Sequence, residues 1–329
     1  MSTIRDVAER AGVSPMTASR VLSGRGYASE AARDAVQGAA AELGYRPNSI
    51  ARALVQGSTR SIGLVVSDVE NPFFAGAARA IADALEVGGY TVLLTNSDED
   101  PEREERLVEA LRSRQIDGLI VAPAAGSSRH LVRAVADGVP LVQIDRAVRG
   151  LDADAVLVDN GHGAAVAVDH LVALGHRRIA CVSDPHALGS ARERLEGFRR
   201  AARRHGLDPL VVEAAGVTQG DGRAATVRAL ELAPTALFTT SNFMTAGAMH
   251  AVTGQGLAIG RDVALIGFDD LDWTTLVDPP ITVVAQPVAE LGRTAAALLV
   301  ERLEPGERAA RRVRLKTTLV IRRSCGEPR

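Results

Sequence analysis

Cysteine, aromatic residues and long apolar runs are all scarce in this chain of 329 residues. Its two cysteines, Cys181 and Cys325, lie far apart in the sequence, so neither a disulfide framework nor a thiolate metal site is expected. No apolar run approaches the roughly 18 residues of a membrane-spanning helix, and the polar N-terminus lacks an export signal. We therefore expect a cytoplasmic protein that needs no metal and no cofactor.

Lysine is nearly absent too, because Lys316 is the only one, and arginine carries the positive charge. The net charge of −2 argues against a nucleic-acid binder, but its distribution does not. Residues 1–60 hold eight arginines and five acidic residues, a net charge of +3, which leaves 30 basic and 35 acidic residues, or −5, for the remainder. A basic excess confined to a small N-terminal segment predicts a nucleic-acid-binding part on a larger acidic body.

The basic segment has the start and stop signals of three short helices. Thr3 is a plausible cap for the first helix, and Gly12 ends it. Ser14 caps the second helix, which begins at Pro15, where the missing N–H of proline costs nothing. The third helix runs from about residue 29 or 30 to residue 43 and is closed by a glycine. Two short helices joined by a tight turn are typical of a helix-turn-helix.

Four sequence runs in this segment closely resemble the headpiece of the lactose-repressor (LacI/GalR) family of bacterial transcription regulators. They are Ile4-Arg5-Asp6-Val7-Ala8, Ala11-Gly12-Val13-Ser14, Thr17-Ala18-Ser19-Arg20-Val21-Leu22 and Leu43-Gly44-Tyr45-Arg46-Pro47-Asn48. The resemblance extends over essentially the whole chain. It implies a DNA-binding headpiece over residues 1–46, a hinge helix and linker over 47–60, and an effector-binding and dimerisation domain over 61–329.

The second helix would present its polar face to the DNA. Ala18, Val21 and Leu22 face inward, which leaves a polar set on or near the outer surface: Pro15, Met16, Thr17, Ser19 and Arg20. We expect Met16 and Arg20, with Pro15 beside them, to meet base edges in the major groove. Serine and arginine side chains such as Ser14, Ser19 and Arg52 would position the phosphates.

The hinge from Pro47 to Val55 is only about two turns long, too short for a helix to be stable alone in water. The resemblance implies that it becomes helical on DNA, pairs with the same segment of a second subunit and wedges Leu54 into a minor-groove step. Such a wedge kinks the duplex at a cost of roughly a few kcal/mol. Asn48 and Ala51 belong to the same predicted contact set. The alternative is that Leu54 is an ordinary apolar linker residue.

After residue 60, short apolar strands alternate regularly with amphipathic helical patterns. Helical crossovers between strands predict two open parallel sheets with helices on both faces. The fold class is therefore α/β, with a headpiece and a two-lobed body that resembles type I periplasmic binding proteins. Strands are expected at 62–67, 91–95, 118–121, 140–145 and 155–158, then at 179–183, 210–213, 236–239 and 263–268.

The last segments are expected to cross back between the lobes. This places the first lobe at about 61–160 and 288–318 and the second at about 161–287 and 319–329. A strand is expected over 311–323, with no leucine heptad after it, so a homodimer is favoured over a tetramer.

Ligands of such sheets bind where strands end, so the loops after the strands are the places to look. In the first lobe, Phe73 and Phe74 follow the first strand although aromatics make up only 3% of the chain. They either contact a ligand or cap the helix that follows. Asp145, at the end of another strand, could bridge sugar hydroxyls or cap a loop.

In the second lobe, the run Ser190-Ala191-Arg192-Glu193-Arg194 precedes Leu195-Glu196-Gly197-Phe198. By resemblance, Ser190 and Arg194 belong to the effector site, with a surface ion pair as the alternative for Arg194. Asp269 would accept hydrogen bonds from the ligand, Gln286 matches a family pocket position, and Trp273 would either stack on a ligand or plug the lobe interface. Many sugar-responsive members carry Asn-Asp where this chain has Ser241-Asn242, which leaves the ligand class open between a carbohydrate, which we favour, and a purine.

The sequence predicts a homodimeric, effector-controlled transcription regulator that binds a pseudo-palindromic operator. We expect a repressor, because members of the resembled family most often are repressors. A solute-binding protein of a transport system would use the same cleft, but the headpiece and the missing export signal oppose it. An enzyme would need an acid and a base, for which Asp269 with Asp270, or His162 with Asp159, could be offered. No nucleophile elbow, phosphate loop or dinucleotide turn supports that reading.

Overall fold

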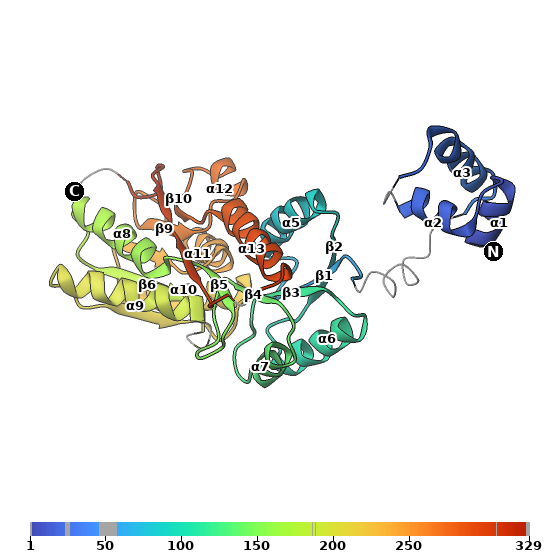
Figure 1. The fold of residues 1–329 in the computed structure, drawn as a ribbon. Coiled ribbons are helices and arrows are strands. Elements are labelled where there is room, and N and C mark those ends of the chain that lie inside the picture. Colours follow the sequence, from blue (N-terminus) through green and yellow to red (C-terminus); the bar gives the residue numbers. More distant parts are fainter. Residues whose placement is uncertain are drawn as a thin grey trace. The chain divides into compact units, whose positions relative to one another are not determined.

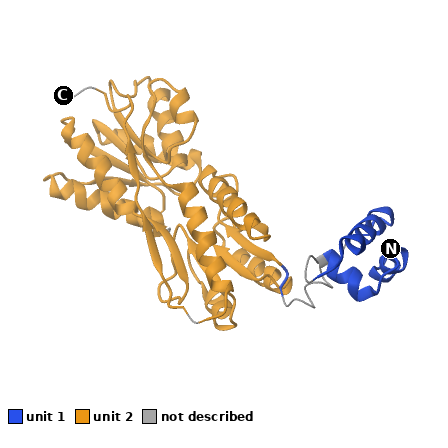
Figure 2. Ribbon diagram, turned by 45° about the horizontal axis from the view of Figure 1, so that its top comes forward, with its two compact units in different colours: residues 1–59 blue, residues 60–329 orange. Residues whose placement is uncertain are grey.

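The structure is a computed structural model that describes residues 2–23, 27–45, 58–185, 187, 189–306 and 308–326. The chain divides into two compact units, residues 1–59 and 60–329 (Figure 2). The hinge and the predicted boundary at residue 46 lie outside the described residues, so the contacts expected of Asn48, Ala51, Arg52 and Leu54 stay predictions. In the described part of the chain, no helix has the length and apolarity needed to cross a bilayer.

The first unit contains the three predicted helices, α1 (Ile4–Arg10), α2 (Pro15–Ser23) and α3 (Glu30–Glu42). The Thr3 hydroxyl accepts the N–H of Asp6 while the Asp6 carboxylate accepts the N–H of Thr3, which is a full capping box. The Ser14 hydroxyl accepts the N–H of Thr17 at 3.1 Å and so starts α2 as predicted. A small core joins the helices: Val7, Ala8, Ala18, Val36, Ala39 and Ala40.

The second unit begins with a fully parallel sheet in the order β11-β5-β4-β3-β1-β2. Figure 1 labels five of these strands, β5, β4, β3, β1 and β2. One core cluster packs α5 (Pro72–Val87) and α13 (Val288–Leu303) on one face, and another packs α6 (Pro101–Ser113) and α7 (Arg129–Ala136) on the other. The strands are β1 (Ser61–Val66), β2 (Thr91–Asn96), β3 (Gly118–Val121), β4 (Leu141–Ile144), β5 (Asp154–Val158) and β11 (Arg312–Leu315).

The second sheet has the order β12-β10-β9-β8-β6-β7. Its two core clusters pack α8 (Asn160–Ala173) with α9 (Gly189–Arg204), and α10 (Gln219–Glu231) with α11 (Asn242–Gly254). A short helix, α12 (Trp273–Leu276), follows β9. The strands are β6 (Ile179–Ser183), β7 (Leu210–Glu213), β8 (Ala236–Thr239), β9 (Ala264–Phe268), β10 (Thr282–Ala285) and β12 (Thr318–Val320).

Both sheets repeat the same strand order, so every strand of one lobe has a counterpart in the other. The prediction of one strand over 311–323 is wrong. The chain leaves the first sheet after Leu315 and enters the second at Thr318, where β12 pairs antiparallel with β10. The crossing therefore divides the apolar run between two sheets. We keep the predicted limits of the lobes as a proposal.

Candidate functional site

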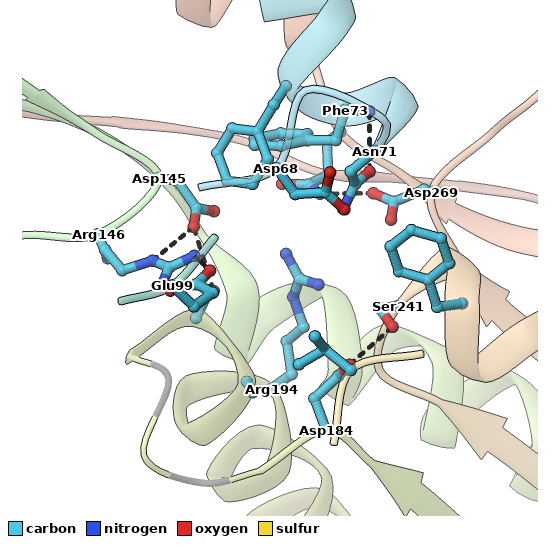
Figure 3. A pocket seen from close by; sticks show the side chains of 16 residues that line it. Asp68, Asn71, Phe73, Glu99, Asp145, Arg146, Asp184, Arg194, Ser241 and Asp269 are labelled. Atoms are coloured by element: carbon cyan, nitrogen blue, oxygen red, sulfur yellow. Dashed lines mark hydrogen bonds and ion pairs between the residues drawn. The ribbon is translucent and has the colours of Figure 1, made fainter. Parts of the chain in front are cut away.

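A cavity lies where strands of both sheets end, within residues 60–329 (Figure 3). It encloses about 590 Å³ free of protein atoms, open solvent at its mouth included. Eight of the nine predicted effector contacts line it: Phe73, Phe74, Asp145, Ser190, Arg194, Ser241, Asp269 and Gln286. The other lining residues are Asp68, Asn71, Glu99, Arg146, Asp184, Ala191, Val217 and Phe243.

Trp273 is the predicted contact that is not found in this lining. It is half-buried and opens α12, four residues after Asp269. Arg322 holds this region from the other side, with its Nη1 donating to Thr274 Oγ1 at 3.0 Å and its Nη2 paired with Asp270 at 2.7 Å. These bonds tie α12 to the segment after β12, so closeness to Asp269 in the sequence does not bring Trp273 to the cavity.

Counting bonds from the described residues, Asp269 accepts more hydrogen bonds than any other carboxylate of the cavity. Its Oδ2 accepts the backbone N–H of Asn242 at 3.2 Å and the side-chain amide of Asn242 at 3.0 Å. Its Oδ1 accepts the amide of Gln286 at 2.5 Å. This bond fixes which end of the Gln286 amide faces the carboxylate, and it leaves Gln286 Oε1 buried with no hydrogen-bond partner among the described residues. A buried acceptor without a partner is costly unless something else supplies the donor.

On the opposite wall, Arg146 lies between two carboxylates. Its Nη1 and Nη2 donate to both oxygens of Glu99 at 2.7 and 2.9 Å, and its Nε donates to Asp145 at 3.0 Å. Burial alone would lower the pKa of Arg146, but the charges of Asp145 and Glu99 outweigh it and raise that pKa above its ordinary value. Arg146 therefore stays a cation that is held in place from two sides.

Arg194 extends from α9 into the middle of the cavity (Figure 3). Its Nε donates to Asn160 Oδ1 at 2.7 Å, its Nη1 donates to the Thr240 carbonyl at 2.6 Å, and its guanidinium lies 3.8 Å from the Phe268 ring centre. The side chain is buried. A surface ion pair is therefore the wrong description of Arg194; on the same helix it is Glu193 that pairs with an exposed arginine, Arg314.

Ser241 and Asp184 form a polar pair at the lower wall. The Ser241 hydroxyl caps α11 by accepting the N–H of Met244 at 3.3 Å, and it donates to Asp184 Oδ1 at 2.9 Å. Burial raises the pKa of Asp184, and hydrogen bonds from Thr240 and Ser241 offset part of that rise. The hydroxyl that replaces the family's amide is thus engaged with Asp184, which itself lines the cavity.

Phe73 and Phe74 form the apolar wall at the start of α5. Their rings meet edge to face with centroids 5.0 Å apart, and both side chains are buried in the core of the first lobe. The cap of α5 is Asn71, whose side chain accepts the N–H of Phe73 at 3.1 Å. The two phenylalanines therefore pack in the core and also face the cavity.

Between the described residues, two hydrogen bonds cross the cavity from one lobe to the other. Ser190 Oγ donates to Asp145 at 3.3 Å, and the Asn242 side chain donates to Asn71 at 3.1 Å. Asn242 also donates to Asp269, so it joins the helix cap of one lobe to the carboxylate of the other. A ligand that changes these contacts would change how the lobes are held together.

Several lining residues were not predicted, although the sequence holds a signal for two of them. The run Val-Ser-Asp recurs where β1 and β6 end and leads into the loops at Asp68 and Asp184, so the repeat of the lobes marks both carboxylates. Glu99 follows β2 in a loop that has no distinguishing motif, and its partnership with Arg146 depends on the fold.

The predicted base-reading face of α2 is on the surface. Met16 is 70% exposed, Pro15, Ser19 and Arg20 are exposed as well, and Thr17 is half-buried. Ser14 is exposed and bonded to Thr17. The exposed side chains of this set lie outside the helical core, where a groove-reading helix presents them.

Two of the four residues offered as an enzymatic acid and base, Asp159 and Asp270, have structural roles. Asp159 caps α8 by accepting the backbone N–H of His162, whose side chain is exposed, and Asp270 pairs with Arg322. Within the described ranges, no group of three or more histidine, cysteine or acidic side chains could hold a metal ion.

Comparison with known proteins finds a family match within each of the two units. Residues 3–48 match the family model described as bacterial regulatory proteins, lacI family, and residues 168–325 match a periplasmic binding protein-like domain. A ribose operon repressor from Halalkalibacterium halodurans is 35% identical over 98% of this chain and 96% of its own length. The chain belongs to the lacI family of bacterial regulatory proteins. It is thus a DNA-binding transcription regulator, as the headpiece predicted.

Two solved structures of such regulators resemble it closely. One is a lac repressor dimer bound to operator and an anti-inducer, 28% identical with a TM-score of 0.90 over 98% of this chain and 99% of that one. The other is a lacI-family regulator from Enterococcus faecium with bound ribose, 30% identical with a TM-score of 0.74 over 82% of this chain and 99% of that one. The fold and the family assignment from sequence are confirmed.

Proposed function

We propose that the protein is a cytoplasmic, homodimeric repressor whose operator affinity is set by a small neutral sugar of the ribose type bound between its lobes. The similar proteins named above include a ribose operon repressor, a ribose-bound regulator and a dimer on operator DNA. These names supply the class of effector and partner. The chemistry of the cavity in this chain supports that class independently.

The observation that carries the proposal is the arrangement of acceptors and donors around an apolar wall. Asp145 and Asp269 face the cavity from opposite lobes, and Arg194 lies between them. Gln286 Oε1 is a buried acceptor that has no donor among the described residues. Sugar hydroxyls both donate and accept, so one ring can satisfy carboxylates, an amide oxygen and a guanidinium at once. Phe73 and Phe74 offer an apolar surface to the C–H face of such a ring.

A purine fits these groups less well. Its ring presents few donors, whereas five carboxylate side chains line the cavity and all accept hydrogen bonds: Asp68, Glu99, Asp145, Asp184 and Asp269. A polyhydroxylated ligand can supply a donor to several of them. The balance of acceptors therefore favours a carbohydrate.

Control of DNA binding would pass through the two lobes. The ligand contacts groups of both lobes, so it binds one lobe arrangement better than the other and shifts the population toward it. In a dimer, that shift would change the spacing of the two hinge segments and hence of the two α2 helices on a pseudo-palindromic operator. Met16 and Arg20 would meet base edges and Ser14 and Ser19 the phosphates.

Calorimetric titration with D-ribose and other neutral sugars tests the effector, and a gel shift with the DNA upstream of the gene tests its consequence. We expect saturable ribose binding at one site per chain and a change in operator affinity of at least fivefold when ribose is present. Sugar binding without any operator binding would instead favour the transport reading. Turnover of a sugar into product would contradict the assignment as a non-enzyme.

A further inference from the structure

Glu99 and Arg146 form a closed ion pair on the cavity wall. Both terminal nitrogens of Arg146 donate to Glu99, and the remaining Nε donates to Asp145, so one guanidinium meets two carboxylates. The pair is largely shielded from solvent, with 10% of the Arg146 side chain and 22% of the Glu99 side chain exposed. The charge of Arg146 is therefore more than neutralised inside the cavity.

Among the described residues, the second cavity arginine, Arg194, has no carboxylate partner at hydrogen-bond distance. Arg194 is held by two neutral oxygens, from Asn160 and Thr240, and by an aromatic face. Its charge is nevertheless surrounded by acidic groups, since Asp68, Asp184 and Asp269 line the same cavity. The described lining residues include five carboxyl side chains and two guanidinium groups, so acidic groups outnumber basic ones.

This excess of acidic side chains affects whether the cavity can bind a negatively charged ligand. A free guanidinium is the preferred bidentate partner of a carboxylate or phosphate group. Arg146 already makes a bond of this kind within the protein, because Glu99 accepts from both of its terminal nitrogens. To bind Arg146 in the same way, an anionic ligand would have to displace the half-buried Glu99 carboxylate, and it would also be repelled by that carboxylate.

We propose that Glu99 is a specificity residue. Because its ion pair occupies the Arg146 guanidinium, the cavity excludes anionic sugars, such as aldonates and sugar phosphates, and admits neutral ones. The inference rests on the proposed sugar site and adds the charge class of its ligand. Neutral hydroxyls can still accept from the second hydrogens of the Arg146 terminal nitrogens and donate to Asp145. Removing the Glu99 charge should therefore open the site to anions while it remains a sugar site.

The test compares D-ribose with D-ribonate and D-ribose 5-phosphate by calorimetric titration. In the unaltered protein we expect ribose to bind and both anions to bind at least a hundredfold more weakly. Glu99→Gln keeps the shape of the side chain and removes its charge, and Glu99→Ala removes the charge and the side chain. In either variant the affinity for one of the anions, relative to ribose, should rise tenfold or more.

Glu102→Gln is the matched control. Glu102 lies exposed in the first turn of α6, three residues after Glu99, and its change alters the net charge of the protein equally. Its ratio of anion to ribose affinity should stay at the value of the unaltered protein. A ratio that rises equally in this variant would show a general charge effect and overturn the role of Glu99.

The remaining outcomes are distinct. If ribose binds but the ratio is unchanged in both Glu99 variants, the specificity role is wrong and the sugar site stands. If the unaltered protein binds an anion as tightly as ribose, the exclusion is wrong and the cavity is a general sugar site. If no neutral sugar binds, the proposed function fails and the inference with it. If thermal melts show that both variants are unfolded, Glu99 is required for folding and the proposal is overturned.

Discussion

Asp145 and Asp269 occupy matching positions in the two lobes. Asp145 directly follows β4 and Asp269 directly follows β9, which are the third strands of their sheets in the same order. Both have a left-handed backbone, with φ of +63° and +75°. This conformation is unfavourable for most side chains but better tolerated by aspartate and asparagine. The repeat of the fold thus places two carboxylates on opposite sides of one cavity.

Asp269→Asn should weaken ribose binding about tenfold to a hundredfold, since a hydrogen bond to a charged group contributes about 1.5–3 kcal/mol. Asparagine tolerates the left-handed backbone, so the change isolates the charge from strain. Calorimetry measures the affinity. Asp272→Asn, at an exposed position three residues later, serves as the control and should leave it unchanged. Equal affinity in Asp269→Asn and the unaltered protein would remove Asp269 from the ligand site.

Gly197→Ala should lower both stability and effector affinity. A Cβ at Gly197 would lie 2.4 Å from the carbonyl oxygen of Gly161, where α9 packs on α8, so one helix must move. Overpacking of this kind costs about 1–3 kcal/mol, and α9 carries Arg194. Denaturant unfolding and calorimetry measure the two effects. Gly254→Ala adds the same methyl group where, among the described residues, no atom outside its own stretch of helix lies within 4 Å, and it should change neither quantity appreciably. An unchanged Gly197→Ala would show that the helices can separate freely.

Much of the fold follows from local patterns. Helix caps such as Thr3 and Ser14 and the strand–helix alternation after residue 60 predicted the order of elements, because each signal lies within a few residues of the element it specifies. The run 311–323 was misread because its apolar pattern does not show that the chain changes sheets between Leu315 and Thr318.

The cavity could be predicted where a polar residue directly follows a strand, as Asp145 and Asp269 do. Glu99 could not, since its significance comes from a bond to Arg146, 47 residues away. For Trp273 the error is a predicted contact that is not found. Its proximity to Asp269 in the sequence suggests that it contacts the ligand, but Trp273 is not among the residues that line the cavity. Contacts between distant loops depend on the closed fold, and a single sequence contains no local signal for them.

Asp154→Asn should destabilise the protein and change its acid sensitivity. Asp154 is fully buried; its Oδ2 accepts from Arg302 at 2.7 Å, and its Oδ1 accepts the N–H of Arg311 at 2.6 Å. Burial raises the pKa of Asp154, but these bonds outweigh it and hold the pKa below its ordinary value of 3.8. The stabilisation is therefore present above that value and is lost as pH falls through the lower, folded-state pKa.

At pH 7, Asp154→Asn should cost roughly 3 kcal/mol of unfolding free energy, because one partner of a buried ion pair is removed. Thermal melts from pH 7 to pH 3 should show the variant losing less stability on acidification than the unaltered protein. Asp272→Asn, exposed, should follow the unaltered protein throughout. Parallel pH curves for Asp154→Asn and the unaltered protein would contradict the role of this carboxylate.

Arg20→Ala should lower the preference of the headpiece for its operator more than its affinity for DNA in general. Arg20 lies exposed on the polar face of α2, and a bidentate arginine contact to a base contributes about 1–3 kcal/mol of discrimination. Arg33→Ala, exposed on α3, removes the same charge from a helix that is not predicted to read bases, so it should weaken binding to operator and to scrambled DNA equally.

Fluorescence anisotropy with both duplexes at one fixed salt concentration measures the ratio of affinities. A ratio that falls for Arg20→Ala alone assigns base reading to Arg20, whereas equal losses in both variants would make it a phosphate contact.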